Sequence, residues 1–326
     1  MIKKLQNFCF RHKLFLPNQS LVVGFSGGPD STALVLFLNH LKKSWKLKIF
    51  LLHINYGLRG KASLADEKFC FKMAKKLALP IKLVTYKSFS TGGSANLEER
   101  LRDFRYSELE KEREKRKADW IAVGHTLDDS AETFLFNLIR GAGLRGLVAL
   151  RAKNGKIIRP LLGVRKKEIL AFLKEKKQSF RLDKSNQSLK FSRNRIRLQL
   201  LPELEKKYNP QIKKRLVDLQ EHLLDVEEWL ERETKKLFLE LVRKENWGWS
   251  MERKSYENLS RAERKSLFRL IMFNLQGNLK NISANAFWEL EKMILSNKSK
   301  NQEIFLKKTR IYRQGEKIIF SIKEEE

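Results

Sequence analysis

Residues 21–34 read LVVGFSGGPDSTAL. An apolar strand, Leu21–Phe25, is followed by a loop of small residues, and an apolar helix then starts at Ser31. A helix that starts directly after such a loop gathers free backbone N–H groups at the positive end of its dipole, and this favours an anion. Gly27 and Gly28 allow a tight turn and a close approach of phosphate. The segment therefore predicts a phosphate site at a strand–helix junction.

Asp30 is the unusual member of this loop, because a carboxylate repels phosphate unless a cation lies between them. A magnesium ion bound to Asp30 is the simplest explanation. Ser26 and Ser31 add hydroxyl donors. The alternative is an ordinary strand–turn–helix with a Gly-Gly turn and no ligand.

The loop lacks the lysine of a Walker A loop, G-x-x-x-x-G-K-[ST]. It resembles the S-G-G-x-D-S pyrophosphate loop of the PP-loop ATP pyrophosphatases, which cut ATP between the α and β phosphates. The resemblance implies that ATP is bound by Ser26, Gly27, Gly28, Pro29, Asp30 and Ser31.

Strand and helix patterns alternate through the first half of the chain, which predicts an α/β fold with a parallel sheet and helices on both faces. The strands are expected at Leu21–Phe25, Ile49–Ile54, Ile81–Thr85, Trp120–Gly124 and Lys156–Arg159. The helices are expected at Ser31–Leu41, Leu64–Leu77, Asn96–Lys117, Asp128–Ile139 and Arg165–Lys177.

The second half is expected to be mainly helical, with a small α+β domain at its end. A basic helix is expected at Phe191–Leu204, and Pro210 marks a boundary. Residues 212–242 have the pattern of one long amphipathic helix. We therefore predict a catalytic domain at 1–210, a linker helix at 211–245 and a small C-terminal domain at 246–326.

Positive charge is concentrated in one part of this 326-residue chain of net charge +30. Residues 151–215 hold 21 Lys and Arg but five Asp and Glu, whereas residues 216–326 hold 21 and 19. A local excess of this kind favours a polyanion partner such as nucleic acid. The alternative, a generally lysine-rich surface, does not explain the nearly neutral C-terminal third.

Cys9 and Cys70 are the only cysteines, and they form no C-x-x-C pair. This excludes a zinc ribbon or iron–sulfur site built on such a pair. No apolar run is long enough to span a bilayer, and no clean secretion signal is present. We expect a cytoplasmic protein without a membrane partner.

Polar motifs follow the expected strands at the edge of the sheet where ligands of such folds bind. They are residues 53–60 (HINYGLRG) and 124–133 (GHTLDDSAET). Asp129 and Glu132 lie on one face of the helix that the second motif enters, and such a pair can hold a substrate amine or a metal. For Asp128, capping of the helix is an equally good explanation.

Arg102 and Arg105 lie three residues apart on one helical face, in the segment Glu98–Tyr106. A solvated surface is the alternative interpretation of this pair.

Together these segments resemble the tRNA(Ile)-lysidine synthase family over residues 20–210. The shared motifs are S-G-G-x-D-S, H-x-N-H-G-L-R, E-E-x-x-R-x-x-R-Y, G-H-x-x-D-D-x-x-E-T, R-G-x-G-L-x-G-L, P-L-L and R-N-x-I-R. Tyr56 stands where the family usually has a second histidine, and Ser130 where it often has glutamine.

The resemblance implies a ligation in two steps, in which ATP adenylates the wobble cytidine of the CAU-anticodon tRNA(Ile) and free lysine then displaces AMP. It implies ATP, Mg²⁺, that tRNA and L-lysine as cofactors and partners; a homodimer stays open. The implied catalytic residues are Asp129, Glu132, Arg105 and Lys174. His53 and His125 are expected at the ATP, with Asp30 at the metal. The expected tRNA contacts are Arg59, Arg140, Arg145, Arg193, Arg195 and Arg197.

Three other functions fit the sequence less well. A tRNA thiolase needs a persulfide cysteine or a cysteine-bound cluster, for which two cysteines outside the motifs are poorly suited. A PP-loop enzyme acting on a small molecule does not explain the basic excess. A non-catalytic RNA-binding protein does not explain the intact acids Asp30, Asp129 and Glu132.

Overall fold

The computed structural model describes residues 1–86, 97–182, 189, 192–279, 282, 284–296, 302–306 and 309–322. Asn96 and Phe191, the expected first residues of two helices, lie outside these ranges. The chain forms two compact units, Met1–Glu221 and His222–Glu326. The division falls within one helix; the three-part arrangement expected from the sequence stays a prediction.

The first unit is built on a six-stranded sheet with the order β3-β2-β1-β4-β6-β5. The strands are β1 (Ser20–Gly24), β2 (Lys48–Asn55), β3 (Ile81–Thr85), β4 (Trp120–Ala122), β5 (Lys153–Asn154) and β6 (Ile157–Ile158). All neighbours pair in parallel except the edge strand β5, which is antiparallel to β6. Chain order reverses at β1 and β4, and open sheets of this kind bind ligands beside such a point.

Helices follow the strands closely, as the alternating pattern predicts. They are α1 (Ile2–Arg11), α2 (Pro29–Lys42), α3 (Lys61–Lys76), α4 (Leu97–Lys115), α5 (Leu127–Ile139), α6 (Leu144–Leu147), the 3₁₀ turn η2 (Pro160–Gly163) and α7 (Lys166–Glu175). The expected α/β class, with helices on both faces, is confirmed.

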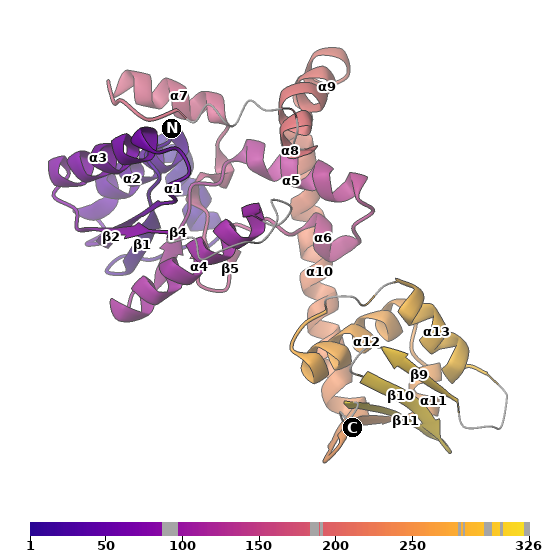
Figure 1. Ribbon diagram of the computed structural model, residues 1–326. Coiled ribbons are helices and arrows are strands. Elements are labelled where there is room, and N and C mark those ends of the chain that lie inside the picture. Colours follow the sequence, from indigo (N-terminus) through magenta and orange to yellow (C-terminus); the bar gives the residue numbers. More distant parts are fainter. Residues whose placement is uncertain are drawn as a thin grey trace. The chain divides into compact units, whose positions relative to one another are not determined.

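The two faces of the sheet are visible in the packing of β1. Leu21 and Val23 point into a core shared with α1, α2, α3 and α7, whereas Val22 points into a second core shared with α4. Figure 1 shows α2 and α3 on one side of the sheet and α4 on the other. Because β1 is buried on both faces, its sequence is continuously apolar, as is typical of a central parallel strand.

The first unit continues through one uninterrupted helical stretch, residues 192–207, in agreement with the basic helix expected at Phe191–Leu204 over the described residues. It consists of α8 (Ser192–Arg195), the π-helical segment η4 (Ile196–Leu200) and α9 (Leu201–Lys207), and the start of α10 (Ile212–Leu241) follows. Gln220 of α10 accepts a hydrogen bond from the hydroxyl of Ser130 in α5 (2.5 Å). Contacts of this kind attach the first part of α10 to the first unit.

The second unit has an antiparallel sheet of order β7-β8-β11-β10-β9. Its strands are β7 (Val242–Glu245), β8 (Gly248–Glu252), β9 (Glu303–Leu306), β10 (Thr309–Gln314) and β11 (Lys317–Ile322), and its helices are α11 (Arg253–Glu257), α12 (Arg261–Gln276) and α13 (Ala284–Ile294). Phe268, Ile311 and Phe320 are buried in one core. In the described part of the chain, no helix is long and apolar enough to cross a membrane.

Candidate active site

The loop between β1 and α2 has a backbone that requires glycine at residue 27. Gly27 has φ of +82°, in the left-handed region that side-chain-bearing residues avoid. A Cβ atom there would lie 3.1 Å from both Cys70 Sγ and Phe69 Cδ1 of α3. The loop therefore turns tightly above α3, and α2 begins two residues later at Pro29.

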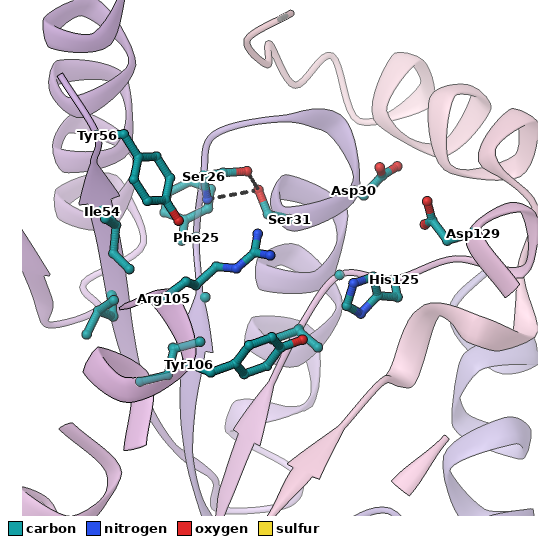
Figure 2. Close-up of a pocket in the computed structure, with 15 residues that line it drawn as sticks. Phe25, Ser26, Asp30, Ser31, Ile54, Tyr56, Arg105, Tyr106, His125 and Asp129 are labelled. Carbon is teal, nitrogen blue, oxygen red and sulfur yellow. Dashed lines mark hydrogen bonds between the residues drawn. The ribbon is translucent and has the colours of Figure 1, made fainter. Parts of the chain in front are cut away.

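Serine hydroxyls hold this loop in place, as Figure 2 shows. The Ser26 amide donates to Ser31 Oγ (3.2 Å), and the two serine hydroxyls lie 3.1 Å apart. Thr32 Oγ1 donates to the carbonyl of Gly27 (3.2 Å). The loop is thus preorganised, with the N-terminal turn of α2 at its base.

The end of β4 lies directly against this loop at Gly124. A Cβ atom on Gly124 would lie 3.2 Å from Asp30 C and from Ser31 N, closer than side chains normally approach a backbone. Glycine therefore allows the loop after β4 to meet the loop after β1. His125 and α5 follow immediately, so the serine loop after β1 and the motif at residues 124–133 face one site.

A cavity of about 250 Å³ opens between these loops. One part is apolar and is lined by Phe25, Leu52, Ile54, Leu109 and Val123. The other part is polar and is lined by Ser26, Asp30, Ser31, Arg105, His125 and Asp129, with Tyr56 and Tyr106 beside Arg105. An apolar slot beside a loop that favours anions suits a purine nucleotide.

Asp30 projects from the first turn of α2 into the polar part of the cavity. Lys166, the first residue of α7, places its Nζ 3.6 Å from Asp30 Oδ2, while Asp30 Oδ1 is buried without a hydrogen-bond partner. Burial raises the pKa of Asp30 to about 6, although the charge of Lys166 opposes this. A buried carboxylate oxygen without a partner is suited to accept a cation.

His125 is neutral because it is buried, and a buried arginine fixes which ring nitrogen carries the proton. Arg159 is 3% exposed; its Nε donates to His125 Nδ1 (3.2 Å), and its Nη1 donates to the carbonyl of Arg151 (2.8 Å). Burial lowers the pKa of His125 to about 4. Because Nδ1 accepts this hydrogen bond, the ring proton lies on Nε2, and His125 is a neutral donor.

The acid pair on α5 is occupied by an arginine of the chain itself. Arg197 of η4 donates from Nε to Glu132 Oε1 (2.7 Å) and from Nη2 to Asp129 Oδ1 (3.0 Å). Glu132 is 3% exposed and its Oε2 has no hydrogen-bond partner. Burial raises the pKa of Glu132, although Arg197 opposes this. Arg197 therefore lies on the acids, not on an open RNA-binding surface.

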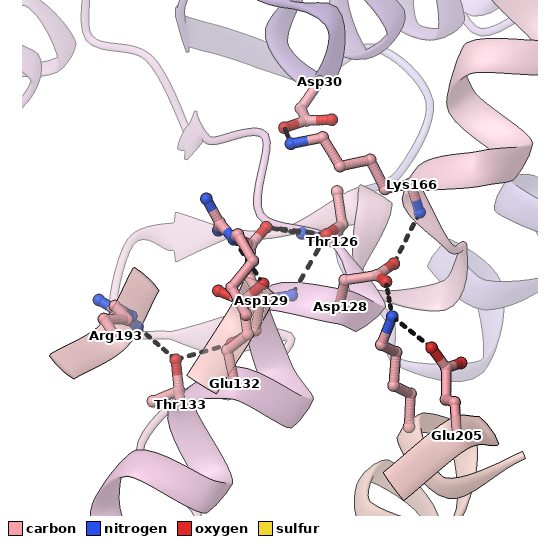
Figure 3. A network of polar contacts seen from close by, with 11 residues as sticks. Asp30, Thr126, Asp128, Asp129, Glu132, Thr133, Lys166, Arg193 and Glu205 are labelled. Atoms are coloured by element: carbon pink, nitrogen blue, oxygen red, sulfur yellow. Dashed lines mark hydrogen bonds and ion pairs between the residues drawn. The ribbon is translucent and has the colours of Figure 1, made fainter. Parts of the chain in front are cut away.

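The capping role considered for Asp128 belongs to Asp129. Asp129 Oδ2 accepts hydrogen bonds from the amide and the hydroxyl of Thr126 (both 2.8 Å), which closes a capping box at the start of α5. Asp128 instead accepts the backbone N–H of Lys166 (2.7 Å) and pairs with Lys213 Nζ (3.1 Å). Figure 3 shows this network.

Arg105 of α4 is brought to the site as expected, and Figure 2 shows its guanidinium pointing toward the serine loop. Lys174 is not: it is exposed on α7, eight residues beyond Lys166, which corresponds to about 12 Å of helix. Lys166 has the position expected for Lys174. His53 lies beneath the loop, where its Nδ1 is 2.9 Å from the carbonyl of Phe25, and does not line the cavity.

The arginines expected at tRNA have several environments. Arg140, Arg145 and Arg195 are exposed. Arg59 pairs with Asp66 on α3 (2.7 Å), and Arg193 donates to Thr133 Oγ1.

The sequence did not single out Lys166 or Arg159. Lys166 is one of many lysines in a basic segment, and only its place at the start of α7 distinguishes it. Arg159 directly precedes the P-L-L motif, which was the one available signal.

The chain is similar to a protein family and to several relatives of known name. A family model described as a PP-loop domain matches residues 1–204. The tRNA(Ile)-lysidine synthase of Bacteroides thetaiotaomicron is 38% identical over 218 residues, covering 66% of this chain and 50% of that protein. That of Caldanaerobacter subterraneus is 31% identical, covering 85% and 60%. That of Chlorobaculum tepidum is 32% identical, covering 84% and 83%.

Among solved structures, the U34-tRNA thiolase NcsA from Methanococcus maripaludis, which carries a 4Fe–4S cluster, shares the fold. Its TM-score is 0.59 at 23% identity, over 69% of this chain and 78% of that one. The chain spans 50% and 60% of the first two relatives but most of the third. The chain therefore belongs to the PP-loop family and, within it, to the tRNA(Ile)-lysidine synthase family.

Proposed function

We propose that this protein ligates lysine to carbon 2 of the wobble cytidine in the CAU-anticodon tRNA(Ile), giving lysidine, AMP and pyrophosphate. The observation that carries the proposal is that the serine loop and Asp129 line one cavity, with Glu132 joined to Asp129 through the guanidinium of Arg197. The serine loop suits a nucleotide that loses pyrophosphate, and the acid pair suits a cationic amine. Membership of the family supports this assignment.

In the first step, ATP lies with its base in the apolar slot and its phosphates at the start of α2. Oxygen 2 of the cytidine attacks the α-phosphorus, and the bond to the bridging oxygen breaks to release pyrophosphate. Arg105 and Lys166 supply positive charge toward these phosphates, and His125 supplies a neutral N–H donor. Donors fixed before the reaction stabilise charge that develops in the transition state.

Mg²⁺ is the natural partner of Asp30 in this site. Among the described residues, no three His, Cys, Asp or Glu side chains group into a metal site. Asp30 Oδ1 is nevertheless buried and without a partner, and Mg²⁺ beside a nucleotide commonly uses one or two carboxylates together with phosphate oxygens. The donor set fits such an ion, which when bound neutralises phosphate charge.

In the second step, the ε-amine of lysine attacks carbon 2, and the bond from that carbon to the adenylated oxygen breaks to release AMP. Asp129 and Glu132 hold the amine, and Glu132 takes up its proton. A carboxylate in a buried position with a raised pKa is a better proton acceptor near neutral pH than an ordinary glutamate. Arg197, which now pairs with both acids, must yield at least one of them to the amine.

The tRNA is expected to lie on the basic part of the first unit. Arg140, Arg145 and Arg195 are exposed there, and the target base must leave the anticodon loop to reach the cavity. Neutralising Arg140 and Arg195 together is expected to reduce tRNA affinity and to flatten its dependence on salt.

A thiolase reaction is disfavoured by the two cysteines of this sequence. Cys9 and Cys70 are buried, and burial raises the pKa of each thiol to about 12. Such thiols are poor nucleophiles and poor metal ligands.

The deciding experiment measures transfer of radiolabelled lysine to a transcript of the CAU-anticodon tRNA(Ile), together with pyrophosphate release. We expect both signals to require ATP and the cytidine, and a transcript with uridine in its place to give neither. RNA binding without any pyrophosphate release would instead support a non-catalytic RNA-binding protein.

A further inference from the structure

A second groove borders α5 and shares no lining residue with the nucleotide cavity. It has a volume of about 630 Å³, within the range of small-ligand sites. Its walls come from α5 on one side and from α8, η4 and α9 on the other. The lining residues are Phe136, Ile139, Arg140, Ser192, Arg195, Ile196, Gln199, Leu200 and Glu203.

A third cavity, of about 510 Å³, borders both the groove and the nucleotide cavity. This third cavity shares Tyr56, Arg105 and His125 with the nucleotide cavity and shares Phe136 with the outer groove. Phe136 thus belongs to the wall that the third cavity and the outer groove share. An RNA strand with one nucleotide at the reacting atoms has a second hollow nearby for the base of the next nucleotide.

The surfaces of the groove combine an apolar floor with a basic rim. Phe136, Ile196 and Leu200 belong to one apolar cluster, and Ile139 is 64% exposed at the edge. The guanidinium of Arg140 lies over the Phe136 ring at 5.0 Å, and Arg195 is exposed. The acidic lining residue, Glu203, is paired with Lys207 (2.8 Å).

Proteins bind single-stranded nucleic acids with aromatic and apolar surfaces that have arginines beside them. The bases stack on these surfaces, and the phosphates lie along the positive charge. η4 is also π-helical, a local distortion that is frequent at functional sites. We propose that this groove binds an unstacked base of the RNA, the base of a nucleotide directly adjacent to the one that is modified. This inference rests on the proposed function, because it takes the anticodon loop as the substrate.

The test uses two neighbouring exposed residues of α5, of which one lines the groove and the other does not. Ile139 lines the groove, whereas Leu138, 50% exposed, is not among the lining residues. Ile139→Asp and Leu138→Asp introduce the same charge at nearly the same place on an exposed surface. A general electrostatic loss of RNA affinity affects both variants equally, and loss of a base-binding groove affects Ile139→Asp alone.

The RNA probe is the anticodon stem-loop of the CAU tRNA(Ile), intact or with an abasic nucleotide on the 5′ or the 3′ side of the target cytidine. Binding is measured by fluorescence anisotropy without ATP or lysine. We expect Ile139→Asp to bind the intact stem-loop about tenfold more weakly than Leu138→Asp does. One of the two abasic RNAs should bind the wild type about tenfold more weakly than the intact stem-loop does. The same abasic RNA should bind Ile139→Asp as well as the intact stem-loop does.

Equal weakening by the two variants would overturn the proposal, and so would additive losses with both abasic RNAs. If Ile139→Asp melts at a lower temperature than Leu138→Asp, the same binding measurements with intact and abasic RNA are made with Arg195→Gln. Arg195 is exposed, so this change is not expected to alter the fold. Binding is measured without the reaction, so the two proposals can fail separately. If the losses from Ile139→Asp and from one abasic RNA are not additive but no lysine is transferred, the proposed ligation is refuted and the base-binding groove is supported. If lysine is transferred but the losses are additive, the groove is refuted and the ligation is supported.

Discussion

Replacing Asp30 by asparagine should make the free protein more stable while it abolishes pyrophosphate release. The carboxyl pKa is about 6 in the folded chain against an ordinary value of 3.8, because burial disfavours the charged form. The folded state therefore binds the proton more tightly than the unfolded state. The stability associated with that proton is complete below pH 3.8 and is lost as the pH rises through about 6.

The size of the effect follows from that gap. At about 1.36 kcal/mol per pH unit, the charged Asp30 costs the folded state about 3 kcal/mol at pH 8. This cost already includes the attraction of Lys166, at 3.6 Å, because the charge of Lys166 is one of the causes that set the pKa. We therefore expect Asp30→Asn to gain about 3 kcal/mol at pH 8, or about 6–12 °C in Tm for a unit of this size.

The assay is urea unfolding of wild type and Asp30→Asn at pH 5 and pH 8, with EDTA and without nucleotide. The gain should be about 3 kcal/mol at pH 8 and about half of that at pH 5, because at pH 5 the carboxyl is already ionised in the unfolded chain but still protonated in the folded one. Asp128→Asn is the matched control, because it weakens an ion pair with Lys213 and should destabilise the protein. An Asp30→Asn protein that is no more stable than wild type at pH 8, or whose gain is the same at both pH values, would refute the reasoning.

Three further outcomes test the site. Lys166→Ala should lower kcat/KM for ATP at least tenfold, whereas Lys174→Ala should not change it; equal losses would restore Lys174 as the phosphate contact. Gly27→Ala forces a side chain into a left-handed backbone with 3.1 Å contacts, so ATP should no longer raise its Tm, and an unchanged thermal shift would contradict the strained loop. Glu132→Gln should raise KM for lysine about tenfold or more while tRNA-dependent pyrophosphate release continues; parallel loss of both activities would move Glu132 out of the amine site.

The central strands and the serine loop could be predicted from the sequence because their signals are local. A continuously apolar strand such as β1 followed by Gly27 and Gly28 has few alternative structures. The β7–β8 hairpin could not be predicted in this way. Gly248 is needed there because a Cβ atom would lie 2.1 Å from the carbonyl oxygen of Phe320, on a strand about 70 residues away in the chain.

The same distinction separates the predicted site residues from those that were missed or misplaced. Asp30, Asp129 and Glu132 stand within motifs, and their helices begin at the loops that carry them. Lys166 and Arg197 reach these acids only through tertiary packing, from α7 and η4. Charge composition could place basic residues in that part of the chain but could not say which guanidinium would neutralise the acid pair.

The ion pair between Asp128 and Lys213 limits how far the protein can be shortened from its C-terminal side without losing stability. The family match ends at residue 204, yet Lys213 and Gln220 lie beyond it and hold α5 from outside. A truncation after residue 210 would remove the charge that pairs with Asp128, whose carboxylate would keep the backbone N–H of Lys166, and would leave Ser130 without its acceptor. A fragment that contains the first unit alone should therefore extend at least through Glu221.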